Sequence, residues 1–194
     1  MVRKCVETDH IFQYHSNNII IIDNFSEKSI RCDNPLELPL LIAKAKAEAL
    51  LIRLRALNTN ESSLILTSDQ IVLFDGKVRE KPVDVAEATF FLSSYSDTCV
   101  ATVSAVVITE FPSGVQTSGV DVAKVHWKSI SDEVVAKVVA KGEIFSSAGG
   151  FRIEDEDLNP LVARIEGSVD SVMGLPVDLT AALLQENIRL LSSI

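Results

Sequence analysis

The stretch 64–82 constrains the fold more than any other part of this chain. It holds two apolar runs, 64–66 and 71–74, which are separated by the polar residues 67–70. The second run closes on Asp75-Gly76, a strong signal for a tight turn between strands. The two runs are therefore predicted to be buried strands with a polar break between them.

Asp69 lies inside this polar break. A carboxylate between two buried strand runs is costly unless it has a partner. Asp69 is therefore either a structural acid with a satisfied charge or a functional one, and spacing alone favours the structural interpretation, because functional sites are the minority case. Lys81-Pro82 ends the stretch, and the proline holds Lys81 extended rather than helical.

Helical and strand patterns alternate along the rest of the chain. Asp84 with Glu87 three residues later is typical of a capping box, Asp178 is predicted to cap the last helix, and Gly142 is a stop signal. One antiparallel hairpin interrupts the alternation, so we expect an α/β fold with a mixed β-sheet. The predicted helices are 36–57, 84–95, 134–141 and 178–191, and the further predicted strands are 19–22, 100–109, 115–127 and 161–165.

The first helix has the clearest pattern. Pro35 suits its first turn, where a missing N–H is harmless. Lys46 and the other cations on this helix are predicted to form a solvated face. The apolar residues near helical spacing are Leu38, Leu41, Ile42, Ala45, Ala49, Ile52 and Ala56.

The chain length fits one domain with a good core, since it has 194 residues of which 47% are hydrophobic. We expect a loose leader over residues 1–18 and a single domain over 19–194. His10 and His15 in the leader are two metal-ligand candidates, although a frayed surface segment is the favoured interpretation.

Composition excludes several classes of protein. The formal net charge of −9 argues against binding a nucleic acid polymer, which needs clustered Lys and Arg. The three cysteines are scattered without a CxxC, so neither a disulfide framework nor a zinc site is indicated. No signal-peptide core is visible, and the run 19–22 is far too short to span a bilayer. A soluble, cytoplasmic protein is expected.

Several short motifs occur in the order seen in one protein family. The chain resembles the Maf-like proteins, nucleoside triphosphate pyrophosphatases related in fold to the inosine triphosphate pyrophosphatases, over about residues 19–190. The resemblance implies a two-lobed α/β fold with a central cleft, and Mg²⁺- or Mn²⁺-assisted hydrolysis between the α- and β-phosphates. It also suggests a homodimer. The motifs are Thr67-Ser-Asp-Gln-Ile-Val, Asp75-Gly, Lys81-Pro82, Ala148-Gly-Gly-Phe, Ile165-Glu-Gly-Ser, Ser171-Val-Met and Gly174-Leu-Pro176.

The resemblance assigns roles to four residues. Asp69 matches the central catalytic aspartate, and Lys81 matches the lysine of a Gly-Lys-Pro motif, although Glu80 precedes it here. Lys46 matches the lysine of an Ala-x-x-Lys-Ala helix, and Glu27 looks like the glutamate after the second strand. Asp69 and Glu27 are carboxylates suited to a divalent metal, and the two lysines suit phosphate oxygens.

Two further residues point to the base. Gln70 and Glu154 match the branch similar to the 7-methyl-GTP pyrophosphatases, and both have hydrogen-bonding groups that guanine can use. A methylated, cationic guanine would also favour an aromatic face from Phe151 or Trp127, but a core role is favoured for both. Without the resemblance, Glu154 would be an acidic surface-loop residue and Asp75 a turn residue.

Two departures from the family pattern keep a second hypothesis open. Ser104-Ala105-Val106 stands where the family has Thr-Gly-Val, and the N-terminal Ser-x-Ser-x-x-Arg-Arg loop is absent from these 194 residues. The first hypothesis is an active pyrophosphatase for modified or non-canonical nucleotides. The second is a weak or inactive relative kept for nucleotide binding or protein interaction. Because the arginine loop is missing, we expect metal-dependent activity that is weak or absent from this chain.

Overall fold

The computed structural model describes residues 29–57 and 61–193 of the chain. The predicted leader 1–18, the predicted strand 19–22 and Glu27 lie outside these residues. Every structural statement below concerns the described part of the chain.

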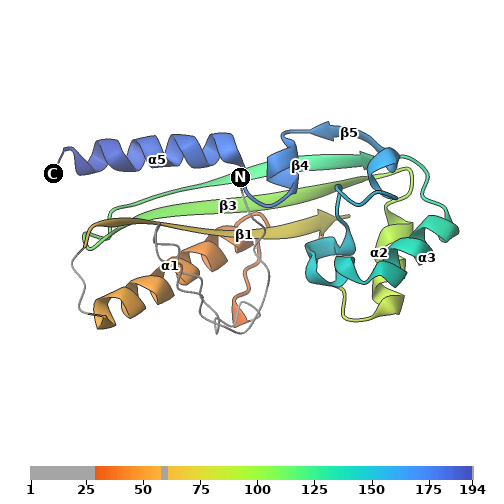
Figure 1. The fold of residues 1–194 in the computed structure, drawn as a ribbon, viewed down its shortest axis with the longest axis horizontal. Coiled ribbons are helices and arrows are strands. Elements are labelled where there is room, and N and C mark those ends of the chain that lie inside the picture. Colours follow the sequence, from red (N-terminus) through yellow and green to blue (C-terminus); the bar gives the residue numbers. More distant parts are fainter. Residues whose placement is uncertain (1–28, 58–60, 194) are drawn as a thin grey trace.

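A long antiparallel sheet forms the centre of the molecule (Figure 1). Its strands lie in the order β2-β1-β3-β4-β5, and all four neighbouring pairs among the described residues are antiparallel. The α/β class predicted from the sequence is confirmed, but the parallel pairing that a mixed sheet requires is not found among the described strands. The strands are β1 Ser63–Phe74, β2 Lys77–Arg79, β3 Cys99–Phe111, β4 Gln116–Trp127 and β5 Val162–Glu166. The helices are α1 Leu38–Ala56, α2 Val85–Ser94, α3 Asp132–Lys141, α4 Val169–Val172 and α5 Val177–Leu191, with 3₁₀ turns η2 Glu143–Ser146, η3 Ala148–Gly150 and η4 Asn159–Leu161.

β1 runs without interruption through the polar residues 67–70, so the predicted break is wrong. Its ladder with β3 is continuous from Ser63, opposite Phe111, to Leu73, opposite Ala101. Backbone hydrogen bonds make this ladder, and they do not depend on side-chain polarity. The polar side chains are tolerated because they find partners; Thr67, for example, donates to the carbonyl of Ala43 at 2.8 Å.

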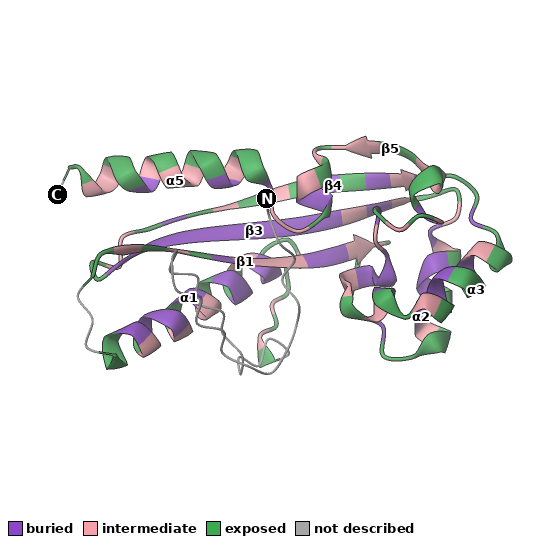
Figure 2. Ribbon diagram, viewed as in Figure 1, coloured by how far each residue is buried: buried purple, intermediate pink, exposed green. Residues whose placement is uncertain are grey.

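Helices lie on both faces of the sheet and at one end of it. In Figure 1, α1 and α5 lie on opposite sides of the long strands, whereas α2 and α3 gather at the end where β1 meets β2. The burial colours of Figure 2 follow this division, with buried stripes on α1 and on the inner sides of α2 and α3. The cores are separate as well. Ala43 and Ala47 of α1 pack against Ala105 and Val107 of β3, while the aromatic core of the other lobe includes Tyr95.

The buried face of α1 differs from the prediction. Leu41 and Ile52 are 40% and 58% exposed, and the helix begins at Leu38, so that Pro39 rather than Pro35 stands in its first turn. The helix carries apolar residues on more than one side, so spacing alone does not select a face, and packing on β1 and β3 decides it. The buried residues of α1 are Leu38, Pro39, Ile42, Ala43, Ala47, Leu50, Leu51 and Leu54.

Most helix boundaries follow their signals. Asp84 caps α2 by accepting from the backbone N–H of Glu87 at 2.8 Å, and Gly142 ends α3 in the left-handed conformation, both as predicted. α5 begins one residue earlier than expected, at Val177, so Asp178 lies in its first turn instead of capping it. Among the described helices, none combines the length and apolar character needed to cross a bilayer.

Candidate active site

Lys46 and Asp69 meet between α1 and β1. The Lys46 Nζ lies 2.8 Å from Asp69 Oδ1 and donates to the Ser68 carbonyl at 3.3 Å. The two side chains are only 23% and 10% exposed. The interpretation of Lys46 as a solvated helix lysine is therefore wrong. A partly buried ion pair of this kind presents a fixed positive and a fixed negative charge in a poorly hydrated place.

Gln70 lies at the centre of a different network, in which its own hydrogen-bond partners are uncharged. Its side-chain Nε2 donates to Ser104 Oγ at 2.8 Å and to the Ser171 carbonyl at 2.7 Å. Ser104 also donates to the Ser171 carbonyl, and Ser171 Oγ donates to Asp121 Oδ2 at 2.5 Å. Ser104 and Ser171 are fully buried. The network joins β1, β3, β4 and α4.

The orientation of the Gln70 amide follows from these contacts. A carbonyl oxygen only accepts, so the side-chain atom facing the carbonyls of Ser171 and Val172 must be the donating nitrogen. The Oε1 atom therefore takes the other position, beside Gly174. No described residue donates a hydrogen bond to it. Gln70 thus offers an acceptor while its donors hold the fold.

Asp69 and Gln70 lie on opposite faces of β1, because successive strand side chains alternate. Asp69 faces α1, and Gln70 faces α4. Both faces of β1 can be reached from the edge of the strand. β2 pairs only with Val72, Leu73 and Phe74, so the outer edge of β1 over 63–71 has no partner strand within the described chain. A ligand lying across this edge could reach both residues.

A pocket of about 210 Å³ opens on the Gln70 face. β1, β3, α4 and the irregular segment 146–154 form its walls. Gln70 and Glu154, the two residues predicted to contact the base, both line it, so the structure brings them to one cavity. The remaining lining residues are Val72, Thr102, Ser146, Ser147, Ala148, Phe151, Arg152, Ile153, Val172 and Met173.

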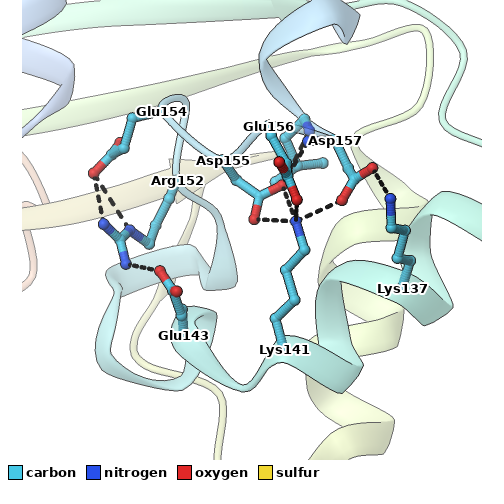
Figure 3. A network of polar contacts seen from close by, with 9 residues as sticks. Lys137, Lys141, Glu143, Arg152, Glu154, Asp155, Glu156 and Asp157 are labelled. Atoms are coloured by element: carbon cyan, nitrogen blue, oxygen red, sulfur yellow. Dashed lines mark hydrogen bonds and ion pairs between the residues drawn. The ribbon is translucent and has the colours of Figure 1, made fainter.

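Glu154 is held by a neighbour that sequence analysis missed. Arg152 contacts Glu154 Oε1 through Nη2 at 3.0 Å and Nε at 3.3 Å, and its Nη1 reaches Glu143 (Figure 3). Glu154 is an exposed loop residue, as its acidic run predicts, and its 41% exposed side chain also lines the pocket. The sequence shows Arg152 just before an acidic run, but this pattern does not reveal which carboxylates Arg152 contacts.

The same loop is tied to α3 by a second group of ion pairs. Lys141 lies 3.0 Å from Asp155 and 3.5 Å from Glu156 and also contacts Asp157, which pairs with Lys137 (Figure 3). The lysines lower the pKa of Asp157, Lys137 most and then Lys141, while the surrounding carboxylates raise the pKa of Lys141. The pairs of Lys141 with Asp155 and Asp157, whose carboxylates are 8% and 16% exposed, fix the loop that carries Glu154.

Phe151 forms part of the pocket and part of the core. It is 6% exposed, and its ring meets those of Trp127 and Tyr95 edge to face at 5.5 and 5.6 Å. The core role predicted for Phe151 and Trp127 is confirmed. Burial raises the pKa of Tyr95 to about 12, although Arg79 acts in the opposite direction.

The turn at Gly149 can approach the sheet because glycine has no side chain. Gly149 has a φ of 68°, and an added Cβ would lie 2.6 Å from Val72 of β1. Its N–H donates to the Glu80 carbonyl at 3.0 Å, and its carbonyl accepts from Tyr95 Oη at 2.8 Å. These contacts fix the turn between β1 and the segment that leads to Lys81.

Lys81 follows two residues after the end of β2. Arg79, that end, is 8% exposed and stacks its guanidinium over Phe74, with 4.1 Å to the ring centroid, and over Phe91 at 4.6 Å. It also donates to Ser94 Oγ at 2.6 Å. The chain leaving β2 is therefore anchored, and an exposed Lys81 follows two residues beyond Arg79, the partner of Val72 in the β1–β2 ladder.

The described residues offer few ligands to a divalent cation. In the described part of the chain, no group of three or more His, Cys, Asp or Glu side chains is arranged to hold a metal. Asp69 alone provides a carboxylate at the proposed catalytic position, and Glu27 lies outside the described residues. Mg²⁺ commonly uses one or two carboxylates, with phosphate oxygens and water completing its shell.

Comparison with known proteins places this chain in a family. The family model for Maf-like proteins matches residues 10–187. A 7-methyl-GTP pyrophosphatase of Dictyostelium discoideum is 33% identical over 183 residues, which cover 93% of this chain and 89% of the relative. A nucleoside triphosphate pyrophosphatase of Salinispora tropica is 31% identical, over 86% of this chain and 73% of the relative. A dTTP/UTP pyrophosphatase of Carboxydothermus hydrogenoformans is 33% identical, over 74% of each.

Proposed function

This chain belongs to the Maf-like protein family, and we propose that it is a nucleoside triphosphate pyrophosphatase that cleaves the bond between the α- and β-phosphates. The observation that carries the proposal is the Lys46–Asp69 ion pair beside the open edge of β1. Relatives named as pyrophosphatases for three kinds of nucleotide support the reaction class.

In the proposed reaction, water attacks the α-phosphorus and pyrophosphate leaves. Asp69 accepts the proton of the attacking water, since a carboxylate held in place by Lys46 is a suitable general base. The new P–O bond forms as the bond from the α-phosphorus to the bridging oxygen breaks. Lys46 and Lys81 present positive charge to the phosphate oxygens. This positive charge stabilises the negative charge that grows on the leaving pyrophosphate.

A divalent cation would lower the pKa of a bound water and neutralise phosphate charge. Asp69 is the described residue that we propose as its protein ligand. Glu27 remains the second proposed carboxylate on the strength of the sequence resemblance. Both Mg²⁺ and Mn²⁺ match this hard oxygen donor set.

For the base, we propose a guanine that is methylated at N7. The pocket presents two acceptors, Oε1 of Gln70 and the carboxylate of Glu154. Guanine has two neighbouring donor groups on its pairing edge, the ring N–H and the amino group, whereas thymine and uracil have a single ring N–H there. The name of the Dictyostelium relative agrees with this choice.

The nucleotide would lie across the edge of β1. Its base would occupy the pocket on the Gln70 face, and its triphosphate would reach Asp69 and Lys46 on the other face. This arrangement gives neighbouring residues different tasks, because Asp69 acts on the phosphate and Gln70 on the base.

Incubation with 7-methyl-GTP, GTP, dTTP and UTP tests the function directly. With Mg²⁺ or Mn²⁺ present, pyrophosphate and a nucleoside monophosphate should form, and kcat/KM should be highest for 7-methyl-GTP. Release of orthophosphate instead of pyrophosphate would overturn the bond assignment. A preference for dTTP would overturn the base assignment alone, and nucleotide binding without turnover would favour the alternative of an inactive relative.

The homodimer suggested by the family resemblance remains a proposal. Light scattering coupled to size-exclusion chromatography would test it, since a species with the monomer mass of 21.1 kDa at assay concentration would contradict it.

A further inference from the structure

Resting on the proposed function, we propose that Glu143 determines base specificity from outside the pocket. Glu143 holds Arg152, Arg152 holds Glu154, and Glu154 faces the base. The trio gives the pocket a net negative charge and so favours a positively charged base over a neutral one of the same shape. Glu143 is thus a positioning residue that acts through Arg152.

The contacts run from Glu143 through Arg152 to Glu154. Arg152 is only 15% exposed, and it lies between Glu143 and Glu154 in Figure 3. Its Nη2 and Nε both reach the same oxygen of Glu154, Oε1, at 3.0 and 3.3 Å. The other carboxylate oxygen, Oε2, accepts no hydrogen bond from the described residues. Arg152 therefore fixes the carboxylate while leaving one oxygen for a ligand.

Glu143 fixes the remaining end of the guanidinium. It belongs to η2, just after α3, and contacts Nη1 of Arg152. It does not line the pocket, whereas Arg152 and Glu154 do. Arginine has a rigid, planar fork of donors, so a restraint on one nitrogen also orients the others. Glu143 can therefore influence the position of Glu154 without touching a substrate.

The charges of the trio do not cancel. Two carboxylates and one guanidinium leave one negative charge beside the pocket. A base methylated at N7 carries a positive charge, and the unmethylated base does not, so this charge distinguishes them. Without Glu143, Arg152 and Glu154 would form a neutral pair, and the attraction for the cationic base would fall.

Binding of the reaction products isolates this effect from catalysis. We propose calorimetric titration of 7-methyl-GMP and GMP into wild-type protein and Glu143→Gln. A partly exposed charge pair is worth up to roughly 1 kcal/mol, which corresponds to about fivefold in Kd. Glu143→Gln should weaken 7-methyl-GMP binding by about fivefold and change GMP binding by less than about twofold.

Glu156→Gln is the matched control. Glu156 lies in the same acidic loop, pairs with Lys141 at 3.5 Å, and does not line the pocket. Its removal takes away the same charge without touching Arg152, so both product affinities should stay within about twofold of wild type. Arg152→Lys keeps the positive charge but loses the fork, and it should also reduce the preference for 7-methyl-GMP.

The outcomes separate this inference from the proposed function. Equal weakening of both products by Glu143→Gln, or an equal effect of Glu156→Gln, would overturn the specificity role while leaving the pyrophosphatase proposal intact. Failure of the wild-type protein to bind either product would overturn the base pocket itself. In turnover assays, Glu143→Gln should raise KM for 7-methyl-GTP and leave kcat unchanged, and a fall in kcat alone would contradict a role in base selection.

Discussion

The two faces of β1 hold their polar side chains by different means. On the α1 face, Asp69 is paired with the cation of Lys46 at 2.8 Å. On the α4 face, Gln70 is held by neutral hydrogen bonds to Ser104 and Ser171, both fully buried. Charge on that second face comes from Asp121, which accepts from Ser171, and from a loop, through Arg152 and Glu154.

This difference separates reactivity from recognition. An ion pair holds a carboxylate in its charged form and in one position, which suits a group that acts in the chemical step. Neutral hydrogen bonds fix an amide in one orientation without adding charge, which suits the reading of a base. If this division holds, substitutions on the two faces should affect different kinetic constants.

Asp69→Asn is expected to have the largest effect. The amide cannot accept a proton from water or balance a cation, so kcat should fall by roughly a hundredfold to a thousandfold, in line with about 3–4 kcal/mol for one catalytic electrostatic group. Binding of 7-methyl-GMP should remain close to wild type, because the base pocket lies on the other face. Steady-state kinetics and product titration measure the two quantities.

Asp75→Asn is the control for Asp69→Asn. Asp75 is an exposed turn residue at the end of the same strand, with a φ of 50°, a conformation that Asn tolerates. Its kcat should be unchanged. An Asp69→Asn enzyme with normal kcat would remove Asp69 from the chemistry, and a large loss of thermal stability would instead support a structural role.

Gln70→Leu should have an intermediate effect and act on recognition. It removes an acceptor from the pocket and leaves the Ser171 carbonyl without one of its donors. KM for 7-methyl-GTP should rise by about tenfold, and the free energy of unfolding should fall by about 0.5–1.5 kcal/mol, the usual net contribution of one hydrogen bond, because Ser104 still donates to that carbonyl. The kcat should change much less than it does in Asp69→Asn.

Thr102→Val provides the comparison on the same face. Thr102 also lines the pocket and is buried, but it makes only a long contact of 3.4 Å to the Ala123 carbonyl. Its substitution should leave both KM and stability nearly unchanged. A matching loss in Thr102→Val would mean that the Gln70 effect reflects general packing and not a specific hydrogen bond.

The smallest predicted effect is a loss of stability at low pH, through the ion pairs of the loop 152–157. The neighbouring lysines lower the pKa of Asp157 in the folded state, so this carboxylate stabilises the fold above its unfolded pKa. That contribution is lost as the pH falls below 3.8, the ordinary pKa of an aspartate, and through the lower pKa that Asp157 has in the folded state. Asp157→Asn should therefore be less stable than wild type near pH 6.

Denaturant titrations at several pH values would measure this difference. The free energies of unfolding of wild type and Asp157→Asn should converge as the pH falls below the lowered folded-state pKa of Asp157, where the wild-type carboxyl is protonated. The gap should also shrink in high salt, because the Lys137 side chain that pairs with Asp157 is 61% exposed. A gap that is constant with pH would show that Asp157 acts through packing or its neutral hydrogen bonds.

Local signals in the sequence predicted much of the fold. The Asp-Gly turn, the Asp84 cap, the stop at Gly142 and the hairpin of β3 and β4 were all identified correctly. These features depend on residues within a few positions of one another, so their physical causes are local. The family membership and the pairing of Gln70 and Glu154 in one pocket also agree with the sequence motifs.

Two errors show where local reasoning stops. The polar residues 67–70 were predicted to interrupt a strand, but the ladder with β3 carries β1 through them. The buried face of α1 was also predicted incorrectly, since Leu41 and Ile52 are exposed. In both cases a partner distant in sequence supplies the energy that decides the structure.

The sequence by itself determined the elements, their turns and the residue types available for phosphate chemistry. Only the tertiary structure decided which of those residues meet. Lys46 reaches Asp69 across 23 positions, Gln70 reaches Ser171 across 101, and Glu143 reaches Glu154 only through Arg152. Such contacts depend on strand register and on how helices pack against the sheet, and these arise from the burial of the whole chain rather than from any short stretch of it.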